Sequence, residues 1–445
     1  MTESGKMKKE TPTHESLDDW MKQEALSFSL ESENFNKAVD TLMASLGSVK
    51  LLGLGEALHG GEEILRLRNR LFQRLVEAYG FRAIAIESSF PRAHSTNEYV
   101  SGRGPESYQE LREIGFGQDF GQLEANRELV EWMKEYNASP AHKTKLRFYG
   151  LDIPTGTAGI ASPRQVLHFV LDYLSSMDKE QPEKQRERME ELLGQDADWE
   201  NPQAHMDPTK SIGLSPNATA LRIETEDLIA ELQAGRPEWI ARSDRDRFLE
   251  ALQHAKVARG LLNFHASMAR TSSRYAERLG IRDMLQADNL LYMISREKNR
   301  GNVFAFAHNS HLKRGTAQWQ LGSDIVTWWP AGSQLSEILG EDYAVIGSGL
   351  GVSEENGIGT PEEGTLEARL TATEGPLRFV PTYSGKGLPT SEIATLPIRS
   401  GSKKNPTYIP FTPQSFTDFD WLAVFDSTGY NRGGTPLQEW DTGSQ

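Results

Sequence analysis

Short apolar runs alternate with amphipathic segments along this chain, and this alternation constrains its fold more than any other feature. Residues 49–56 form an apolar run that ends in glycine and glutamate, and residues 62–79 then carry apolar side chains at helical spacing up to Gly80. This order is typical of a buried parallel strand and its crossover helix. The same kind of run returns at residues 82–87, 145–152 and 302–307. The repetition predicts an α/β fold with a mostly parallel central sheet flanked by helices.

Strand signals disappear between residues 154 and 274, where helical periodicity takes over. Helices are predicted at residues 164–176, 183–193, 219–233 and 244–268, followed by another long helix at residues 275–297. We therefore predict an all-helical cap at residues 154–274, inserted into an α/β core made of residues 31–153 and 275–445. Residues 1–30 are assigned to a tail and a leading helix. The cap is expected to shape the substrate pocket.

Weaker signals lie at the two ends of the chain. A polar tail is followed by an amphipathic segment at residues 17–28 and a capped helix at residues 32–46. Residues 324–328 and 343–347 are candidates for further strands, and residues 421–425 form one more buried apolar run. We therefore expect the sheet to resume after the long helix.

The charge balance and the absence of cysteine exclude several classes of function. The formal net charge is -15 at pH 7, which works against binding to nucleic acid phosphates or anionic membranes. Without cysteine, disulfides, cysteine-ligated zinc, iron–sulfur clusters and thiol nucleophiles are excluded. The amino terminus lacks the apolar region of a signal peptide, and no segment approaches the ~20 apolar residues that span a bilayer. These features predict a cytoplasmic protein whose partner is a small molecule.

Ionisable residues follow each of the four predicted core strands. In open α/β sheets, ligands bind outside the carboxyl ends of the strands, so we expect these side chains to converge on one cleft. Singly, each side chain has a simpler explanation as a helix cap or a loop hydrogen bond. They are Glu56 and His59 after the first strand, Glu87 after the second, Asp152 after the third, and His308 and His311 after the fourth.

The spacing of His308 and His311 raises the alternative of a metal site. The two histidines follow a strand, however, and do not have the i, i+4 spacing that places two ligands on one helix face. The chain also contains no His-Glu-x-x-His motif. We predict no metal and no cofactor, and keep a metal-dependent hydrolase as the alternative.

The segment Gly55-Glu56-Ala57-Leu58-His59-Gly60 resembles the Gly-Glu-x-x-His-Gly signature of the erythromycin esterase family, some members of which are described as succinoglycan biosynthesis proteins. Ala57-Leu58 replaces the small hydroxyl residues that are frequent in the family. The resemblance spans about residues 51–347 and is extended, in order, by Ile86-Glu87, Tyr149-Gly150-Leu151-Asp152, Arg282-Asp283 and Ala307-His308-Asn309-Ser310-His311. It implies cleavage of a carboxylic ester or macrolactone, with a link to antibiotic resistance. A non-catalytic or transferase member that binds a polysaccharide precursor is the second alternative.

Direct attack by water is the mechanism that these residue types favour. The chain has no cysteine, and no Gly-x-Ser-x-Gly elbow lies between a predicted strand and helix, so no covalent nucleophile is evident. An imidazole titrates near neutrality and is suited to general base catalysis, a role that the family resemblance also gives to His59. The predicted catalytic residues are His59, Glu56, Glu87, His308 and His311, and the predicted substrate or oxyanion residues are Arg68, Arg282 and Asp152.

Overall fold

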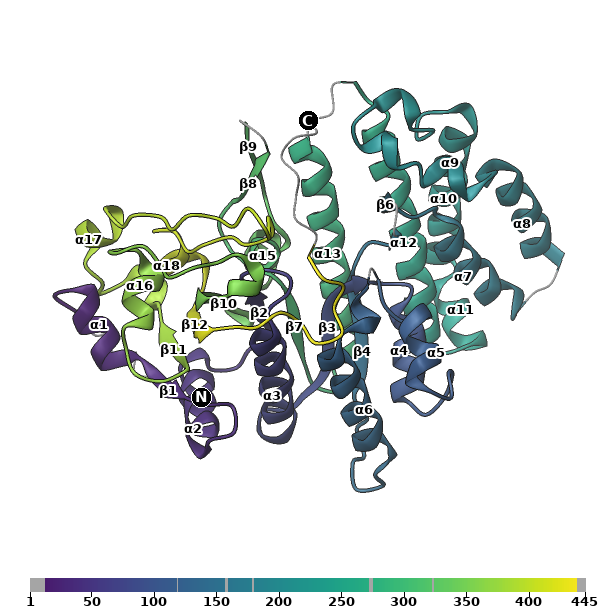
Figure 1. The fold of residues 1–445 in the computed structure, drawn as a ribbon. Helices are drawn as coiled ribbons and strands as arrows, with labels where there is room; N and C mark the ends of the chain where they lie inside the picture. The colour runs from purple at the N-terminus through teal and green to yellow at the C-terminus, as the bar shows by residue number, and fades with distance from the viewer. Residues whose placement is uncertain are drawn as a thin grey trace, which may run out of the picture.

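The computed structural model describes residues 13–437, apart from residue 118 and residues 157–158, 178–179, 272–274 and 322–323. Most of the predicted polar tail therefore lies outside the described residues. Helices pack on both faces of an eight-stranded sheet with the order β1-β11-β12-β10-β2-β7-β3-β4 (Figure 1). The strands are β1 Leu26–Phe28, β2 Leu51–Glu56, β3 Phe81–Ser89, β4 Arg147–Asp152, β7 Asn302–His308, β10 Tyr343–Val352, β11 Leu377–Pro381 and β12 Trp421–Ser427.

The six strands from β12 to β4 run parallel to one another, whereas β11 is antiparallel to both of its neighbours. This arrangement confirms the prediction of a mostly parallel α/β sheet. The four strands predicted to carry the site, β2, β7, β3 and β4, are adjacent in the sheet. Their carboxyl ends therefore meet at one edge, as expected of parallel neighbours.

Each face of the sheet is buried under its own helices because apolar side chains alternate along the strands. Leu52 and Leu54 of β2 belong to one core, whereas Leu51 belongs to the other. The first core is covered by α2 Glu33–Leu46, α3 Glu62–Ala78, α4 Ala93–Val100 and α6 Glu124–Ala138. The second is covered by α1 Leu17–Glu24, α13 Tyr275–Glu297, α15 Ala331–Leu339, α16 Leu366–Thr371 and the helices of the insertion.

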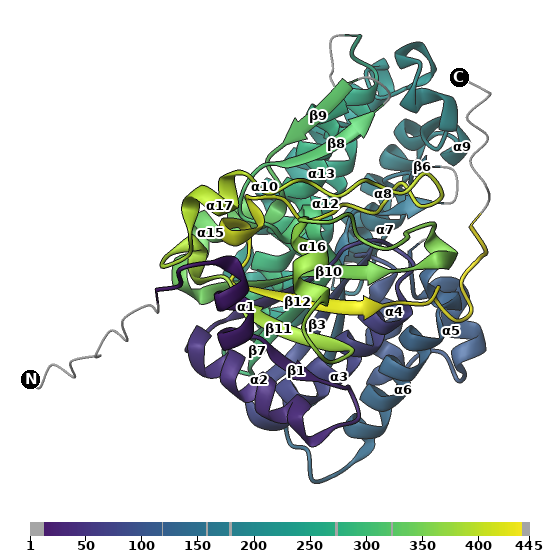
Figure 2. The same cartoon turned by 60° about the vertical axis from the view of Figure 1, so that its left-hand side comes forward.

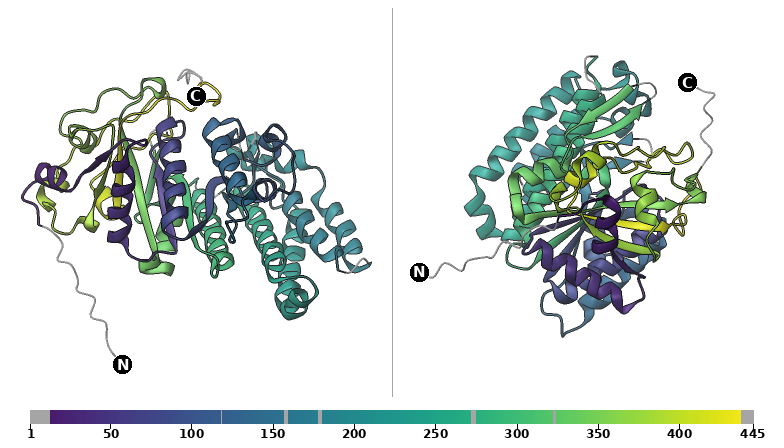
Figure 3. Two further views of the ribbon diagram at one scale, coloured as in Figure 1. Left: turned by 90° about the horizontal axis from the view of Figure 1, so that it is seen from below. Right: turned by 90° about the vertical axis from the view of Figure 1, so that its left-hand side faces the viewer.

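The insertion between β4 and α13 is helical, as predicted, except for a short hairpin formed by β5 Thr155–Gly156 and β6 Gly159–Ile160. Its helices lie on the β4 side of the molecule (Figures 1 and 3). Their apolar side chains continue the core under α13. The boundary at residues 154–274 stays a prediction. The main helices are α7 Arg164–Ser175, α8 Glu180–Leu193, α10 Pro216–Ala234, α11 Arg236–Arg242 and α12 Arg245–Met268.

Residues 324–328 form a strand, as predicted, but the expectation that this strand extends the central sheet was wrong. Residues 324–328 do not join the central sheet; β9 Asp324–Trp328 pairs only with β8 Ala317–Leu321 in a separate hairpin, which projects beside α13 (Figure 2). β9 is largely solvent-exposed, with Ile325 65% exposed. The amphipathic segment at residues 17–28 consists of α1, which ends at Glu24, and β1, which pairs with the unpredicted strand β11.

The close approach of two strand ends depends on Gly55 in β2. A Cβ atom at this position would lie 2.2 Å from Oδ1 of Asn309, the residue that follows β7. Asn309 uses that oxygen to accept from the backbone N–H of Ser348 at 3.1 Å, and its Nδ2 donates to the carbonyl oxygen of Ser348 at 2.8 Å. The pair of glycine and asparagine thus ties β2, β7 and β10 together directly below the candidate site. None of the helices in the described part of the chain is both long and apolar enough to cross a membrane.

Candidate active site

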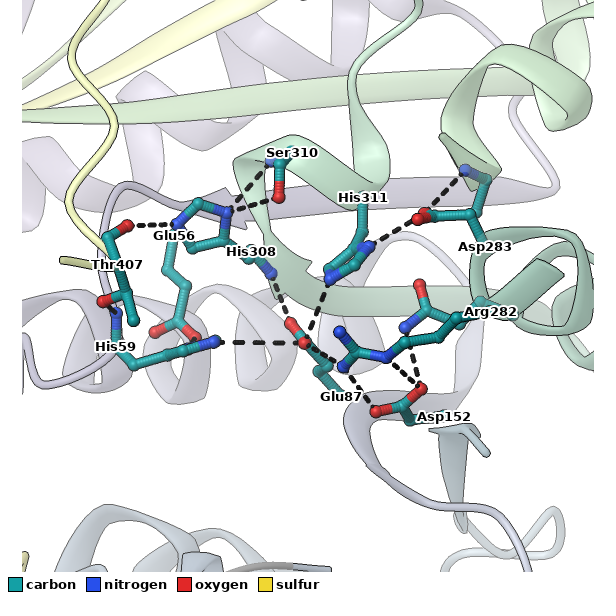
Figure 4. A network of polar contacts seen from close by, with 12 residues as sticks. Glu56, His59, Glu87, Asp152, Arg282, Asp283, His308, Ser310, His311 and Thr407 are labelled. Carbon is teal, nitrogen blue, oxygen red and sulfur yellow. Dashed lines mark hydrogen bonds and ion pairs between the residues drawn. The ribbon is translucent and has the colours of Figure 1, made fainter. Parts of the chain in front are cut away.

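The ionisable residues that were predicted at four separate strand ends lie together at the carboxyl edge of the sheet (Figure 4). They form one connected network of hydrogen bonds and ion pairs. Its members from the prediction are Glu56, His59, Glu87, Asp152, Arg282, His308 and His311. Arg68 lies close by, but no hydrogen bond or ion pair joins it to the network within the described part of the chain.

His59 is held at one ring nitrogen by Glu56. Its Nδ1 lies 2.6 Å from Glu56 Oε1, and its backbone N–H donates to Thr407 Oγ1 at 3.0 Å. The His59 side chain is 33% exposed, whereas that of Glu56 is only 5% exposed. Burial lowers the pKa of His59, but the carboxylates of Glu56 and Glu87 outweigh burial and raise it above its ordinary value. His59 is therefore an anchored imidazole that is still open to a ligand.

Glu87 is the hub of the network. Its Oε1 accepts from Arg282 Nη2 at 2.8 Å and lies 3.2 Å from His311 Nε2 and 4.0 Å from His59 Nε2. Its Oε2 accepts from the backbone N–H of His308 at 2.8 Å. Burial raises the pKa of Glu87, but the nearby cations, His311 foremost, hold it well below the ordinary value. Glu87 is therefore an ionised carboxylate shared between cationic groups from different elements.

Asp152 at the end of β4 and Arg282 of α13 form a bidentate ion pair. Arg282 Nε donates to Asp152 Oδ1 at 2.9 Å, and Arg282 Nη2 donates to Asp152 Oδ2 at 2.6 Å. Gln286, one turn further along α13, donates to the same carboxylate at 3.0 Å. A two-point contact of this kind fixes both position and orientation of the guanidinium. Asp152 thus aims Arg282 at Glu87.

Asp283 belongs to this network although it was not among the predicted site residues. It is fully buried and accepts three hydrogen bonds, from His311 Nδ1 at 2.8 Å, Trp328 Nε1 at 2.7 Å and the backbone N–H of Ala331 at 3.0 Å. Burial lowers the pKa of His311, but Asp283 and Glu87 together raise it to about 10. His311 is therefore a stable imidazolium. In the sequence, Asp283 could have been recognised as an acidic residue on the buried side of a long predicted helix, next to Arg282.

His308 is engaged at both ring nitrogens. Nε2 lies 2.8 Å from the carbonyl oxygen of Thr407 and must donate to it, while Nδ1 accepts from the backbone N–H of Ser310 at 3.1 Å. Burial, together with the neighbouring His59, lowers the pKa of His308 to about 3. The ring is thus neutral and fixed in one tautomer. It ties the segment around Thr407 to the end of β7.

An open cleft lies next to these groups. His59, Glu87, Arg282 and His311 line it on one side. Its other side is largely apolar and is formed by Tyr275, Leu279, Trp319, Trp328 and Ile409. The expectation that residues 154–274 shape the pocket was wrong for the described residues, since the wall comes from α13, the β8–β9 hairpin and the segment 406–409.

Arg68 lies in a second, smaller chamber, which shares His59 and Glu87 with the cleft and which we call the inner chamber. This chamber is lined by Glu56, His59, Gly60, Leu65, Arg68, Ile86, Glu87, Phe120, Leu123, Asn126, Phe306 and Asn431. Arg68 is almost fully buried, and its guanidinium donates to Asn69 Oδ1 and the carbonyl oxygen of Ala125. Arg68 is therefore not a surface residue.

The groups best placed to hold a metal ion are Glu56, His59 and Glu87, whose ligand atoms lie within 4.8 Å of one another. A cation at this position would have to share Glu87 with Arg282 and His311, which already carry positive charge. The His308 and His311 pair does not supply adjacent ligands, because its ring centres are 6.5 Å apart and His308 has both nitrogens engaged. A divalent cation at the first set would therefore compete with Arg282 and His311 for Glu87.

Comparison with known proteins gives the same family at the level of sequence and fold. The sequence profile described as erythromycin esterase matches residues 76–428, which begins after the segment containing Glu56 and His59. A curated relative, "Erythromycin esterase type II" from Escherichia coli, is 24% identical over 342 residues that cover 74% of this chain and 76% of the relative.

Solved structures share the fold along nearly the whole chain. A Bacillus cereus protein has a TM-score of 0.73 at 17% identity, covering 94% of this chain and 98% of that one. A structure titled succinoglycan biosynthesis protein has a TM-score of 0.67 at 18% identity, covering 94% and 98%. A mutant erythromycin esterase, EreC, in its open conformation has a TM-score of 0.67 at 18% identity, covering 93% and 100%. The profile match spans well over half of the 445 residues, so the chain belongs to the erythromycin esterase family, which supports a hydrolase of the esterase kind.

Proposed function

We propose that this protein is a metal-independent hydrolase that cleaves a carboxylic ester or macrolactone with a water molecule activated by His59. The observation that carries the proposal is the state of the His59 ring. Glu56 holds Nδ1 at 2.6 Å, while Nε2 lies 4.0 Å from its nearest carboxylate and His59 lines the cleft. An imidazole that is oriented through one nitrogen and available at the other is the arrangement required of a general base.

In the proposed reaction, neutral His59 takes a proton at Nε2 from a water molecule whose oxygen attacks the ester carbonyl carbon. Glu56 accepts a hydrogen bond from Nδ1–H and stabilises the imidazolium that forms. The tetrahedral intermediate then breaks its bond to the alcohol oxygen, and His59 returns the proton to the leaving alkoxide. The products are a carboxylic acid and an alcohol, so the reaction needs no reactant besides water.

Arg282 and His311 are proposed to stabilise the oxyanion. Both line the cleft, and both are held as cations by buried carboxylates, Asp152 for the first and Asp283 for the second. Preorganised cations in a site that excludes water stabilise developing charge strongly. Asp152 and Asp283 act through these cations and are positioning residues.

We propose a role for His308 that differs from the predicted catalytic one. A ring with a low pKa and two engaged nitrogens has no proton to give to the leaving alcohol. We propose that it fixes the segment around Thr407, whose hydroxyl accepts from the backbone N–H of His59. His308 is then a positioning residue for the base.

The cleft supports a bulky, largely apolar substrate. Its aromatic wall of Tyr275, Trp319 and Trp328 suits a large apolar ring. The name of the Escherichia coli relative points to the same class, the macrolides. A macrolide lactone is therefore the proposed substrate, with antibiotic resistance as the proposed consequence.

A panel of simple esters, lactones and macrolides of different ring size tests this proposal. We expect the wild type to hydrolyse at least one macrolide or other bulky lactone, and His59→Ala to lose activity by about 10²-fold or more. His142→Ala is the matched control, because His142 is stacked on Tyr136 in the loop after α6 and touches nothing in the network. Activity that disappears on exhaustive chelation and returns with a divalent metal would establish the metal-dependent alternative, built on Glu56, His59 and Glu87.

A further inference from the structure

The inner chamber and the substrate cleft are two separate spaces that share only His59 and Glu87 among their lining residues. The cleft is walled by α13, the β8–β9 hairpin and the segment 406–409. The chamber is walled instead by α3, α6, the turn at Phe120 and the segment that contains Asn431. Glu56 lines the chamber and does not line the cleft. The proposed base and its carboxylate partner therefore face a second space that a substrate in the cleft leaves uncovered.

The chamber contains a buried cation, Arg68, which lies over the Phe306 ring at 5.0 Å and is attracted by Glu56 without forming an ion pair in the described part of the chain. Arg68 is 1% exposed, and within the described part of the chain no carboxylate oxygen lies within 4.0 Å of its guanidinium. Its Nε and Nη2 donate to neutral acceptors, and Nη1 makes no hydrogen bond to a described residue. Burial lowers the pKa of Arg68 to about 10, so the group is still charged at neutral pH. Such a donor is costly to bury unless something in the chamber binds to it.

Two buried acceptors also lack partners. Asn126 Oδ1 and Asn431 Oδ1 accept no hydrogen bond within the described part of the chain, and both residues are at least nine-tenths buried. The orientation of the Asn126 amide is fixed, because its Nδ2 donates to the carbonyl oxygen of Phe120 at 2.8 Å. The chamber thus presents one cationic donor and two neutral acceptors. Only a molecule that both donates and accepts hydrogen bonds satisfies this set.

The size of the chamber limits which molecule can bind in it. The chamber has room for the centres of only about one or two water molecules, which is too little for a substrate ring. Two polar partners or more for each water are the usual condition for a buried hydration site, and the chamber offers them. The ring of Phe120 lies 6.3 Å from that of His59 and separates the chamber from solvent only in part, since Phe120 is half-buried.

We infer that the inner chamber stores the attacking water and delivers it to His59 from outside the substrate cleft. This inference rests on the proposed function, because it assigns the source of the nucleophile in that reaction. A bulky ester in the aromatic cleft excludes solvent from that side of His59, so hydrolysis needs a second route for water. Arg68, Asn126 and Asn431 hold the stored water, and Glu56 and His59 border it.

Two variants of the chamber and a crystal structure of the full chain test this inference. Asn126→Leu and Asn431→Leu each remove one acceptor and make the chamber apolar. We expect kcat for a hydrolysed lactone to fall at least tenfold while KM stays within twofold, and the melting temperature to show that both variants fold. Asn36→Leu, at an exposed position of α2, is the matched control. Leu279→Ala, on the cleft wall, should raise KM instead.

The crystal structure of the wild type should show ordered water bonded to Arg68 Nη1 and Asn126 Oδ1. A chamber filled by side chains, or both folded variants retaining the wild-type kcat, would overturn the inference and leave the proposed function intact. A wild type that hydrolyses no ester would contradict the proposed function itself, and with it the role of the inner chamber in delivering water. The two failures are therefore distinguishable.

Discussion

At the scale of single residues, the candidate site is a set of charges whose protonation states are imposed by their neighbours. Three imidazoles lie within one network, yet the pKa of His308 is lowered to about 3, that of His311 is raised to about 10, and that of His59 is raised by carboxylates. Burial alone lowers the pKa of all three histidines, so the different directions of their shifts result from their hydrogen-bonding and charged neighbours. The sequence cannot show this, because it identifies histidines without their partners.

The pH dependence of hydrolysis should report on the pair formed by Glu56 and His59. A general base must be neutral, so kcat/KM is expected to rise as the pH rises through the pKa of His59, which lies above 6.5. Glu56→Gln removes the charge that raises this pKa, so the rising limb should move to lower pH while the maximal rate falls. Measured pH–rate profiles check this. A limb that does not move would show that Glu56 does not act on the base.

His311 should titrate far above an ordinary histidine. Its pKa is raised from 6.5 to about 10, so the folded state binds this proton more tightly than the unfolded chain. The resulting contribution to the free energy of unfolding is complete below pH 6.5 and is lost as the pH rises through about 10. NMR titration of the imidazole should show this shift, and Asp283→Asn should move the midpoint toward 6.5. A wild-type midpoint near 6.5 would contradict the buried ion pair.

At the scale of secondary-structure elements, part of the wall of the proposed substrate cleft is formed by elements that were not predicted to contribute to the site. The β8–β9 hairpin brings Trp319 and Trp328 to the cleft, and Trp328 also donates to Asp283. Neither tryptophan is among the predicted site residues, because a tryptophan near a strand is equally consistent with a core position. The four strand ends were predictable because parallel neighbours must end together. The contacts of a protruding hairpin follow no such rule.

The hairpin should determine affinity for bulky substrates. Trp319→Ala removes an aromatic side chain from the cleft wall and should raise KM for a macrolide or other bulky lactone by about tenfold, since losing such contact area costs on the order of 1–3 kcal/mol. A small ester, which cannot reach the hairpin, should be unaffected. Trp329 is 64% exposed and does not line the cleft, so Trp329→Ala is the control. Equal effects of the two variants would exclude the hairpin as a substrate wall.

Gly55 should be intolerant of even one methyl group. Its Cβ would lie 2.2 Å from Asn309 Oδ1 and 3.0 Å from Asn309 Cα, so Gly55→Ala is expected to lower the free energy of unfolding by about 1–3 kcal/mol. Gly280, within α13, has open space around its Cβ position, and Gly280→Ala should stabilise the protein by about 0.5–1 kcal/mol. Urea unfolding of both variants gives the comparison. A neutral Gly55→Ala would contradict the close packing of β2 against Asn309.

At the scale of the whole molecule, one end of a parallel sheet gathers residues from distant parts of the sequence into a single site. The sheet and most helices were predictable from apolar periodicity, which depends on local sequence. The edge strand β1 and its neighbour β11 were not, because each is short and is placed in the sheet by pairing with residues distant in the sequence. Asp283 and the segment around Thr407 were missed for the same reason, since their roles exist only through contacts with His311 and His59.

The central claim is that His59, without a metal, activates water for ester hydrolysis. The most direct measurement is the turnover of one macrolide or other bulky lactone by the wild type and by His59→Ala, both after exhaustive chelation and with metal content measured. The account predicts that the metal-free wild type keeps its full rate and that His59→Ala is slower by about 10²-fold or more. Equal rates for the two proteins, or a wild type inactive without metal, would contradict it.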